Sequence, residues 1–158
     1  MKKRKSGRRP VWSREEAAAA DALRYIESSA VVAALLERDV AALEAMRALG
    51  RRITSALTFA ETGRALSRAR AAGRLTAAEE RAAVTTLAQL EQRVHVVDVS
   101  ADVLARARRP FPVDPIRTLD AIHLATVELL GDSPPLVTIV TRDERIRANA
   151  LALGYQVE

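Results

Sequence analysis

Four acidic side chains of this 158-residue sequence stand where carboxylates could do chemistry: Glu27, Glu61, Asp120 and Asp143. Glu27 follows the apolar run "LRYI", although glutamate is disfavoured in strands, and Asp143 follows the apolar run "PLVTIVT". Carboxylates gathered at one place repel one another, and a hard divalent cation such as Mg²⁺ relieves that repulsion through oxygen ligands. Such a cation can activate water against a phosphodiester. Taken together, the four acids predict a metal-dependent hydrolytic site.

Each of the four acids also has a structural explanation. Glu27 precedes a predicted helix and favours its positive end, and Glu61 stands three residues before Arg64, a spacing that suits a surface ion pair. Asp120 falls in a first helical turn, where an acid offsets the helix dipole, and Asp143 has the type and position of an N-cap. Taken singly, each acid is better explained by a structural role than by catalysis. The structural explanation is weakest for Glu27.

The elements that must position these acids alternate between strands and helices. Strands are predicted at 23–27, 51–55, 94–99, 135–141 and 155–157, and helices at 13–22, 29–37, 39–50, 55–72, 76–92, 101–108, 118–131 and 143–154. Most strands are continuously apolar, which is typical of a parallel sheet covered on both faces. An α/β fold is therefore predicted. In such sheets, functional groups gather beyond the carboxyl ends of the strands, where Glu27 and Asp143 fall.

The basic character of the chain, with a net charge of +5, comes from its start. Residues 1–10, "MKKRKSGRRP", carry six basic side chains and no acid, which leaves 19 Lys and Arg against 20 Asp and Glu in the rest. We therefore predict a basic extension over residues 1–22, followed by one domain over 23–158. The extension is either a mobile arm attracted to nucleic-acid phosphates, or a partly disordered leader or misassigned start. Its lack of aromatics and periodicity favours the second interpretation.

Composition also limits the class of protein. No apolar run approaches the roughly 18 residues that a membrane span needs, so no membrane partner is expected. No uncharged apolar segment follows the basic start, so a secretory signal is not expected either. The absence of cysteine is compatible with a reducing compartment, and the predicted location is the cytoplasm.

Four segments carry a resemblance to a known family: "YIESSAVVAALL", "SALTFAETGRAL", "RTLDAIHLATVELL" and "IVTRDERIRANALALGYQV". Together they span about residues 24–157, and in this order they resemble the PIN-domain ribonucleases, in particular the VapC-type toxins of toxin–antitoxin pairs. The resemblance implies a three-layer α/β/α fold around a central parallel sheet of about five strands. It also implies cleavage of single-stranded RNA or RNA loops with Mg²⁺ or Mn²⁺, a cognate antitoxin as partner, and a homodimer.

The resemblance also assigns roles to the acids. Glu27, Glu61, Asp120 and Asp143 match the family's acidic quartet, with Glu27, Asp120 and Asp143 as metal ligands and Glu61 orienting water or a second ion. Ser29 matches the hydroxyl residue that supports the site. Hydroxide attack in line would leave a 5′-phosphate and a 3′-hydroxyl. Because the family usually has Asp at position 27, the extra methylene implies an adjusted backbone, reduced activity or a preference for Mn²⁺.

Histidines and arginines supply further candidates. His123 stands three residues after Asp120 on one helix face, so it could support the metal site by contacting a ligand, but a hydrogen-bonded structural histidine is the favoured interpretation. His95 is an ordinary strand residue. Arg142, beside Asp143, is the foremost candidate for binding RNA phosphates. Other candidates, which solvated helix faces explain equally well, are Arg64, Arg117 and Arg145.

Two other functions compete with the ribonuclease. A catalytically weak PIN-like module that binds RNA or protein without cutting would accommodate the unusual Glu27, and metal affinity would separate it from an enzyme. A phospho-acceptor signalling domain also clusters acids at strand ends, but such domains rely on a lysine after a late strand. No lysine follows Lys5, which argues against that domain.

Overall fold

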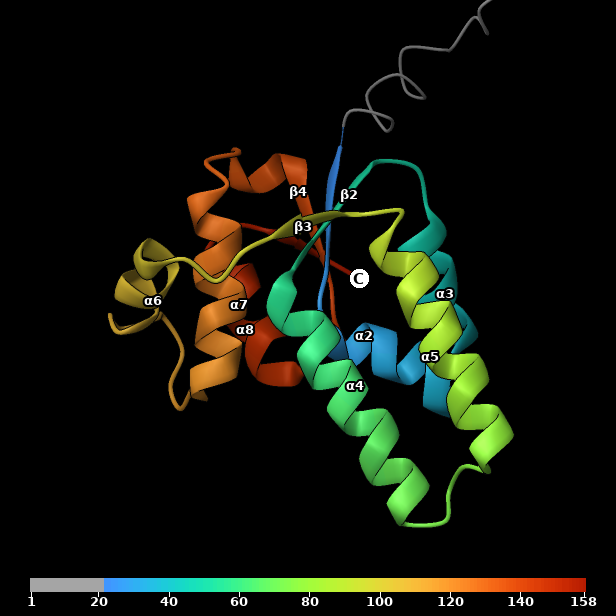
Figure 1. Ribbon diagram of the computed structural model, residues 1–158. Coiled ribbons are helices and arrows are strands. Elements are labelled where there is room, and N and C mark those ends of the chain that lie inside the picture. The colour runs from blue at the N-terminus through green and yellow to red at the C-terminus, as the bar shows by residue number, and fades with distance from the viewer. Residues whose placement is uncertain (1–21) are drawn as a thin grey trace, which may run out of the picture.

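A five-stranded sheet forms the centre of the computed structural model, which describes residues 22–158 (Figure 1). The strands are β1 (Leu23–Ile26), β2 (Arg51–Ser55), β3 (His95–Val97), β4 (Val137–Val140) and β5 (Gln156–Val157). Their spatial order is β3-β2-β1-β4-β5, and all four pairings are parallel. The order reverses at β1, so the edge between β1 and β4 is where a functional site is expected.

Helices cover both faces of the sheet and complete three layers (Figure 1). One face is covered by α2 (Ser28–Val32), the π-helical turn η1 (Ala33–Glu37), α3 (Val40–Arg47), α4 (Ala56–Ala71) and α5 (Ala77–Glu91). The other is covered by α6 (Ala101–Ala107), α7 (Thr118–Leu129) and α8 (Glu144–Ala152). A short 3₁₀ turn, η2 (Pro134–Leu136), precedes β4. The predicted three-layer α/β/α fold is confirmed.

Each face of the sheet has its own apolar core, because successive strand residues point to opposite faces. Tyr25 packs with the side chains of α7 and α8, whereas Ile26 packs with those of α2, α3 and α4. Across the sheet, Tyr25 lies in register with Ile53 of β2 and Ile139 of β4. Aliphatic side chains fill most of both cores, as the 3% aromatic content requires.

Local capping chemistry sets most helix starts where the sequence predicts them. The side chains of Asp39, Ser55 and Asp143 accept hydrogen bonds from the first turns of α3, α4 and α8. Thr76 and Glu79 form the reciprocal capping box that their spacing predicts for α5. Within residues 22–158, no helix is long and apolar enough to cross a membrane.

Apart from shifts of up to three residues at the ends of other elements, the predictions differ from the structure in two places. The strand predicted over 23–27 ends at Ile26, because Glu27 serves the following helix as its N-cap. The single helix predicted over 29–37 is α2 followed by η1, and Arg38 ends the π turn in a left-handed conformation at φ 55°. The helix predicted over 13–22 lies outside the described residues, apart from its last position, and the domain boundary at residue 23 remains a prediction.

Candidate active site

Glu27 joins β1 to α2, and its side chain turns back to cap that helix. Its carboxylate accepts a hydrogen bond from the backbone N–H of Ser29 at 3.0 Å. Hydroxyl groups of Ser28, at 2.6 Å, Thr141, at 2.8 Å, and Ser29 donate to the same carboxylate. Because Glu27 is only 3% exposed, these donors take the place of water around a buried acid.

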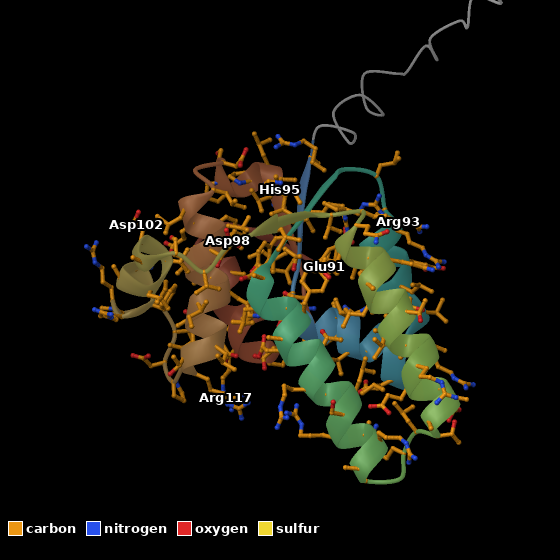
Figure 2. The ribbon with its side chains drawn as sticks, in the orientation of Figure 1. Glu91, Arg93, His95, Asp98, Asp102 and Arg117 are labelled. Carbon is orange, nitrogen blue, oxygen red and sulfur yellow. The ribbon has the colours of Figure 1, made fainter. Side chains whose placement is uncertain are left out.

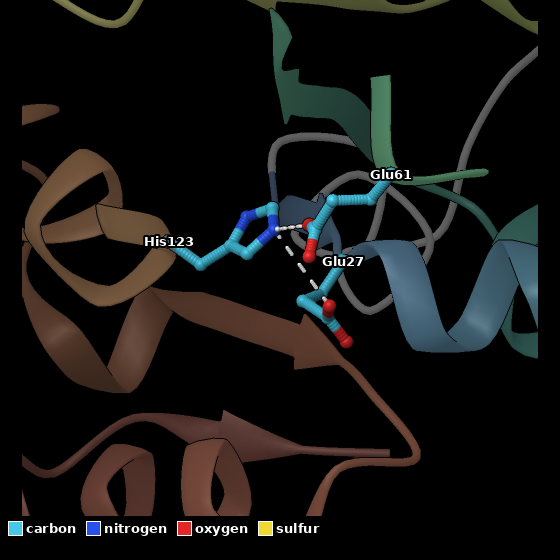
Figure 3. A group of neighbouring side chains, drawn as sticks. All are labelled: Glu27, Glu61 and His123. Carbon is cyan, nitrogen blue, oxygen red and sulfur yellow. Dashed lines mark hydrogen bonds and ion pairs between the residues drawn. The ribbon is translucent and has the colours of Figure 1, made fainter. Parts of the chain in front are cut away.

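The two oxygens of this carboxylate differ in how much acceptor capacity they retain. Oε2 accepts from the N–H and hydroxyl of Ser29 and from Thr141, whereas Oε1 accepts from Ser28 alone among the described residues. A carboxylate oxygen has about two lone pairs. Oε1 lies 3.7 Å from Nε2 of His123. The oxygen of Glu27 with spare capacity therefore faces the cluster drawn in Figure 3.

His123 of α7 contacts Glu61 of α4, as Figure 3 shows, and on its other side it contacts Tyr25 of β1. Its Nε2 lies 2.7 Å from Oε2 of Glu61, and its Nδ1 lies 2.7 Å from the hydroxyl of Tyr25. The imidazole is only 1% exposed. One ligand atom each from Glu27, Glu61 and His123 lies within 4.8 Å of the others. The predicted hydrogen bonding of His123 is confirmed, and one of its partners is a member of the acidic quartet.

The surroundings of Tyr25 and Glu61 set the protonation of the two ends of this hydrogen-bonded chain. Burial, followed by the negative charge of Glu27, raises the pKa of Tyr25 well above its usual value, so its phenol stays protonated. All bonds are satisfied when Tyr25 donates to Nδ1 of His123 and the Nε2–H donates to Glu61. Burial alone would raise the pKa of Glu61, but the hydrogen bond from His123 and the attraction of that ring lower it overall. Glu61 is thus held as an oriented carboxylate.

Asp143 combines an N-cap with a free carboxylate oxygen. Its Oδ1 accepts from the N–H groups of Arg145, at 2.8 Å, and Ile146, at 3.2 Å. No hydrogen bond from residues 22–158 reaches its Oδ2. The N–H of Asp143 donates to Oγ1 of Thr141 at 3.1 Å, and the same hydroxyl donates to Glu27. One buried threonine therefore positions two of the predicted acids.

Asp120 lies close enough to the other acids for their negative charges to affect its pKa. It stands in the first turn of α7 and accepts a long hydrogen bond, 3.4 Å, from the N–H of Arg117. Burial, followed by the negative charges of Asp143 and Glu27, raises the pKa of Asp120 above its usual value. Repulsion of this kind is what a bound cation would relieve.

The other predicted residues take distinct places. Ser29 touches the carboxylate of Glu27, and its Oγ also accepts from the N–H of Arg142 at 2.7 Å. The guanidinium of Arg142 is bound to Asp39 at 2.8 Å, away from the acidic cluster, so its contact with RNA remains a prediction. His95 of β3 lies on the opposite side of the view from Arg117, the residue before α7, and it takes no part in this cluster (Figure 2).

Sequence reasoning did not single out Tyr25 and Thr141. Tyr25 stands two residues before Glu27, a spacing that places two strand residues on one face, and a buried tyrosine hydroxyl usually finds a partner. Thr141 precedes the RD pair, at the end of a buried strand. Both signals were present, but neither identifies the partner, because Tyr25 and His123 are 98 residues apart.

The residues present suit a hard or borderline divalent cation. Oε1 of Glu27, Oδ2 of Asp143 and the exposed part of Asp120 offer oxygen ligands, as Mg²⁺ and Mn²⁺ prefer. Nε2 of His123 already donates to Glu61 in the assignment above and is not needed as a ligand. The carboxylates of Glu27 and Glu61, the imidazole between them and the raised pKa of Asp120 together fit a cation at this edge of the sheet.

Comparison with known proteins identifies the family. The PIN domain family matches residues 24–151. The chain belongs to the PIN-domain family. Among curated members, ribonuclease VapC35 of Mycobacterium tuberculosis is 36% identical over 139 residues, covering 84% of this chain and 93% of that protein. Ribonuclease VapC46 of the same organism is 38% identical, covering 84% of this chain and 94% of its own length. This PIN-domain protein is therefore of the VapC type.

Solved PIN-domain structures share its fold at low sequence identity. VapC20 of M. tuberculosis, a toxin that cleaves the sarcin–ricin loop, has a TM-score of 0.57 and 20% identity, covering 79% of this chain and 93% of that one. VapBC-1 of nontypeable Haemophilus influenzae has a TM-score of 0.56 and 13% identity, covering 86% and 96%. At these identities the two structures support the fold of this PIN-domain protein, and the curated relatives carry the family assignment.

Proposed function

We propose that this PIN-domain protein is an endoribonuclease that hydrolyses RNA phosphodiesters with Mg²⁺ or Mn²⁺ and acts as the toxin of a toxin–antitoxin pair. The observation that carries the proposal is the convergence of Glu27 and His123, both buried, with half-buried Glu61 at the carboxyl edge of the sheet, within reach of the charges of Asp120 and Asp143. Curated relatives at 36% and 38% identity are named ribonucleases, which supports the same chemistry.

In the proposed site, Glu27, Asp120 and Asp143 hold the cation. When bound, the cation neutralises the phosphodiester charge and activates water for attack. Glu61 orients the attacking water, because His123 fixes the direction of its carboxylate and keeps it ionised. In-line attack leaves a 5′-phosphate and a 3′-hydroxyl. Ser29 and Thr141 hold Glu27 in place, so that little rearrangement is needed when the substrate binds.

The capping role of Glu27 explains how a longer acid is accommodated where the family usually has Asp. The side chain bends back to accept from the N–H of Ser29, so the extra methylene is taken up by the turn between β1 and α2. This conformation keeps Oε1 directed at His123 and Glu61. We therefore expect Glu27 to serve as a metal ligand without a large change in the backbone.

The proposed regulation needs a protein partner. A cavity of about 170 Å³ opens between α2, η1, α3 and α5, and its apolar walls include Val31, Leu35 and Leu90. Arg47 and Arg93 stand at the same cavity and would favour an acidic amphipathic segment. We propose that a cognate antitoxin covers this face, that the enzyme forms a homodimer, and that it acts on RNA in the cytoplasm.

One observation favours a second function. Oε2 of Glu27 accepts three hydrogen bonds and Oε1 accepts another, so much of this carboxylate is already occupied. If the hydrogen bonds to Glu27 keep this carboxylate from binding a metal, the site could still bind RNA or protein without one. In that case, calorimetry would show retained RNA binding with negligible affinity for Mn²⁺.

Cleavage of a mixed-sequence RNA pool by purified, antitoxin-free protein tests the proposal. We expect cutting with Mg²⁺ or Mn²⁺, none with EDTA, and loss of cutting in Asp120→Asn. Asp132→Asn, at an exposed acid between α7 and η2, is the matched control and should cut normally. Equal cutting with EDTA, or undiminished cutting by Asp120→Asn, would refute the metal-dependent mechanism.

A further inference from the structure

A groove of about 300 Å³ runs beside the predicted water-orienting acid, Glu61. It is lined by Leu57, Ala60, Glu61, Arg64 and Arg68 of α4 and by Leu119 of α7. The groove is therefore continuous with the catalytic cluster through one shared carboxylate. It lies at the carboxyl edge of the sheet, where a substrate must approach the acids.

Two unpaired arginines follow Glu61 along α4. Arg64 and Arg68 come three and seven residues later, which places them one and two turns along the same helix face. Both are exposed, and neither forms an ion pair with any of residues 22–158. Arg68 is close enough to the site for its charge to contribute to the lowered pKa of Glu61.

The groove also has apolar lining from both helices. Leu119 is 44% exposed although it stands beside Asp120 at the start of α7, and Leu57 is half-buried at the start of α4. Apolar lining of this kind suits the flat face of an unpaired base, and the neighbouring arginines suit the phosphates that join such bases.

We propose that this groove binds the single-stranded RNA next to the bond that is cut, with Arg64 and Arg68 contacting successive backbone phosphates and Leu57 and Leu119 packing against a base. The inference rests on the proposed ribonuclease function and adds the path of the substrate strand. The two arginines are about 6 Å apart along the helix axis, a spacing that lets one strand contact both.

The same evidence argues against Arg142 as the main phosphate contact. Its Nε donates to Asp39 at 2.8 Å, and an Nη donates to the carbonyl of Thr141 at 3.3 Å. Two of the five N–H donors of this guanidinium are therefore already engaged by the protein. Arg64 and Arg68 have no such partners among the described residues, so the geometry moves the predicted RNA contact from the loop before α8 to α4.

The test is RNA affinity in a protein that cannot cut. Fluorescence anisotropy of a short mixed-sequence single-stranded RNA would be measured on Asp120→Asn over a series of KCl concentrations. We expect Arg64→Gln and Arg68→Gln each to lower the slope of log affinity against log salt by about 0.7, as for one lost single-strand phosphate contact. The double variant should bind at least about tenfold more weakly at low salt.

Arg51→Gln is the matched control, because Arg51 is an exposed arginine at the amino end of β2, on the opposite edge of the sheet. It should leave both the affinity and the salt slope unchanged. Arg68→Lys should retain most of the slope, because lysine keeps the charge that a phosphate contact needs. Circular dichroism of every variant would show that the fold is intact.

The outcomes separate the groove from the proposed function. If the wild type cuts RNA but the double variant binds RNA as tightly as its parent, RNA binding in the groove is refuted, whereas the proposed ribonuclease function is retained. An RNA affinity unchanged in the double variant, with weakened binding of an acidic peptide, would assign the groove to a protein partner. A wild type that does not cut, with a parent that binds no RNA, would refute both.

Discussion

At the scale of single residues, the site depends on which carboxylate oxygens are bound by protein donors and which are left to face the acidic cluster. Oε2 of Glu27 is taken up by donors from Ser29 and Thr141, whereas Oε1 faces Glu61 and His123. Glu61 gains its orientation from His123, which in turn is bound by Tyr25. Each acid therefore keeps one part of its carboxylate for the protein and offers another to a cation or to water.

Replacing His123 should weaken catalysis without removing a metal ligand. In His123→Gln, we expect the rate of RNA cleavage to fall by about 10- to 100-fold, the usual cost of losing a partner that orients a site carboxylate. The pKa of Glu61 should rise, because burial raises it and the contact with His123 that lowers it would be weakened. Single-turnover rates over a range of pH would measure both effects.

The matched control for that change is His95→Gln, at the exposed histidine of β3. It should leave the rate and its pH dependence unaltered. A His123→Gln enzyme as fast as the wild type, with the same pH profile, would show that the bond to Glu61 plays no part in catalysis.

The raised pKa of Asp120 has a consequence for stability. Between the usual pKa of an aspartate and this raised value, the folded metal-free protein binds a proton that the unfolded chain has lost. Stability therefore falls as the pH rises through that window. In Asp120→Asn we expect a metal-free protein that is slightly more stable at neutral pH, by less than about 1 kcal/mol because the side chain is half-exposed.

Urea denaturation in EDTA at several pH values would measure this effect. The difference between Asp120→Asn and wild type should shrink at acidic pH, where both side chains are neutral. A variant that is less stable than the wild type at neutral pH would contradict the inferred repulsion among Asp120, Asp143 and Glu27.

At the scale of secondary-structure elements, the acids are positioned by helix starts. Glu27 caps α2, Asp143 caps α8, and Asp120 stands in the first turn of α7. The positive ends of three helices thus point toward the carboxylates and reduce the cost of gathering negative charge. Strand and helix order bring these starts to one edge of the sheet, although they are far apart in sequence.

Two substitutions at Asp143 separate its capping from its chemistry. Asparagine caps a helix about as well as aspartate, so Asp143→Asn should change the free energy of unfolding by less than about 0.5 kcal/mol. Asp143→Ala loses the cap as well and should cost about 1 kcal/mol. Both should lose most RNA cleavage, because both remove the charge proposed to hold metal.

Denaturant unfolding and cleavage rates, measured on the same preparations, would distinguish the two roles. If Asp143→Asn cut RNA at the wild-type rate, the contribution of Asp143 would be confined to capping α8.

Local signals explain which elements the sequence could predict. The caps at Asp39, Ser55 and Asp143 and the capping box at Thr76 depend on neighbours within a few residues, so they were predictable. The π turn after α2 has no comparable sequence signal. Its end depends on Arg38 adopting a left-handed conformation, which is uncommon outside glycine.

The hydrogen-bond partners within the site could not be predicted from the sequence, because they are far apart along the chain. The resemblance named the four acids, but the bond between Glu61 and His123 joins residues 62 apart, and that between Arg142 and Asp39 joins residues 103 apart. Such pairings appear only when the fold is known. They place His123 against one of the predicted acids, and they are the basis for proposing an RNA contact on α4.

At the scale of the whole molecule, charge is divided between the start of the chain and the domain. Residues 1–10 carry six basic groups, whereas the rest of the chain is close to neutral. In the proposed function, RNA affinity of the domain therefore comes from local groups such as Arg64 and Arg68, beside a cluster of acids whose charge a bound cation would offset. The role of the basic extension remains a prediction that lies outside the described residues.

The dependence of RNA cleavage on Mn²⁺ tests the central claim most directly. Single-turnover cutting of one RNA, chosen from the pool because it is cut at one position, would be followed across a Mn²⁺ titration for wild type and Asp120→Asn. The account predicts a rate that rises from near zero in EDTA to saturation in the wild type and stays near zero in the variant. A wild-type rate independent of Mn²⁺, or a variant that saturates at the same rate, would contradict it.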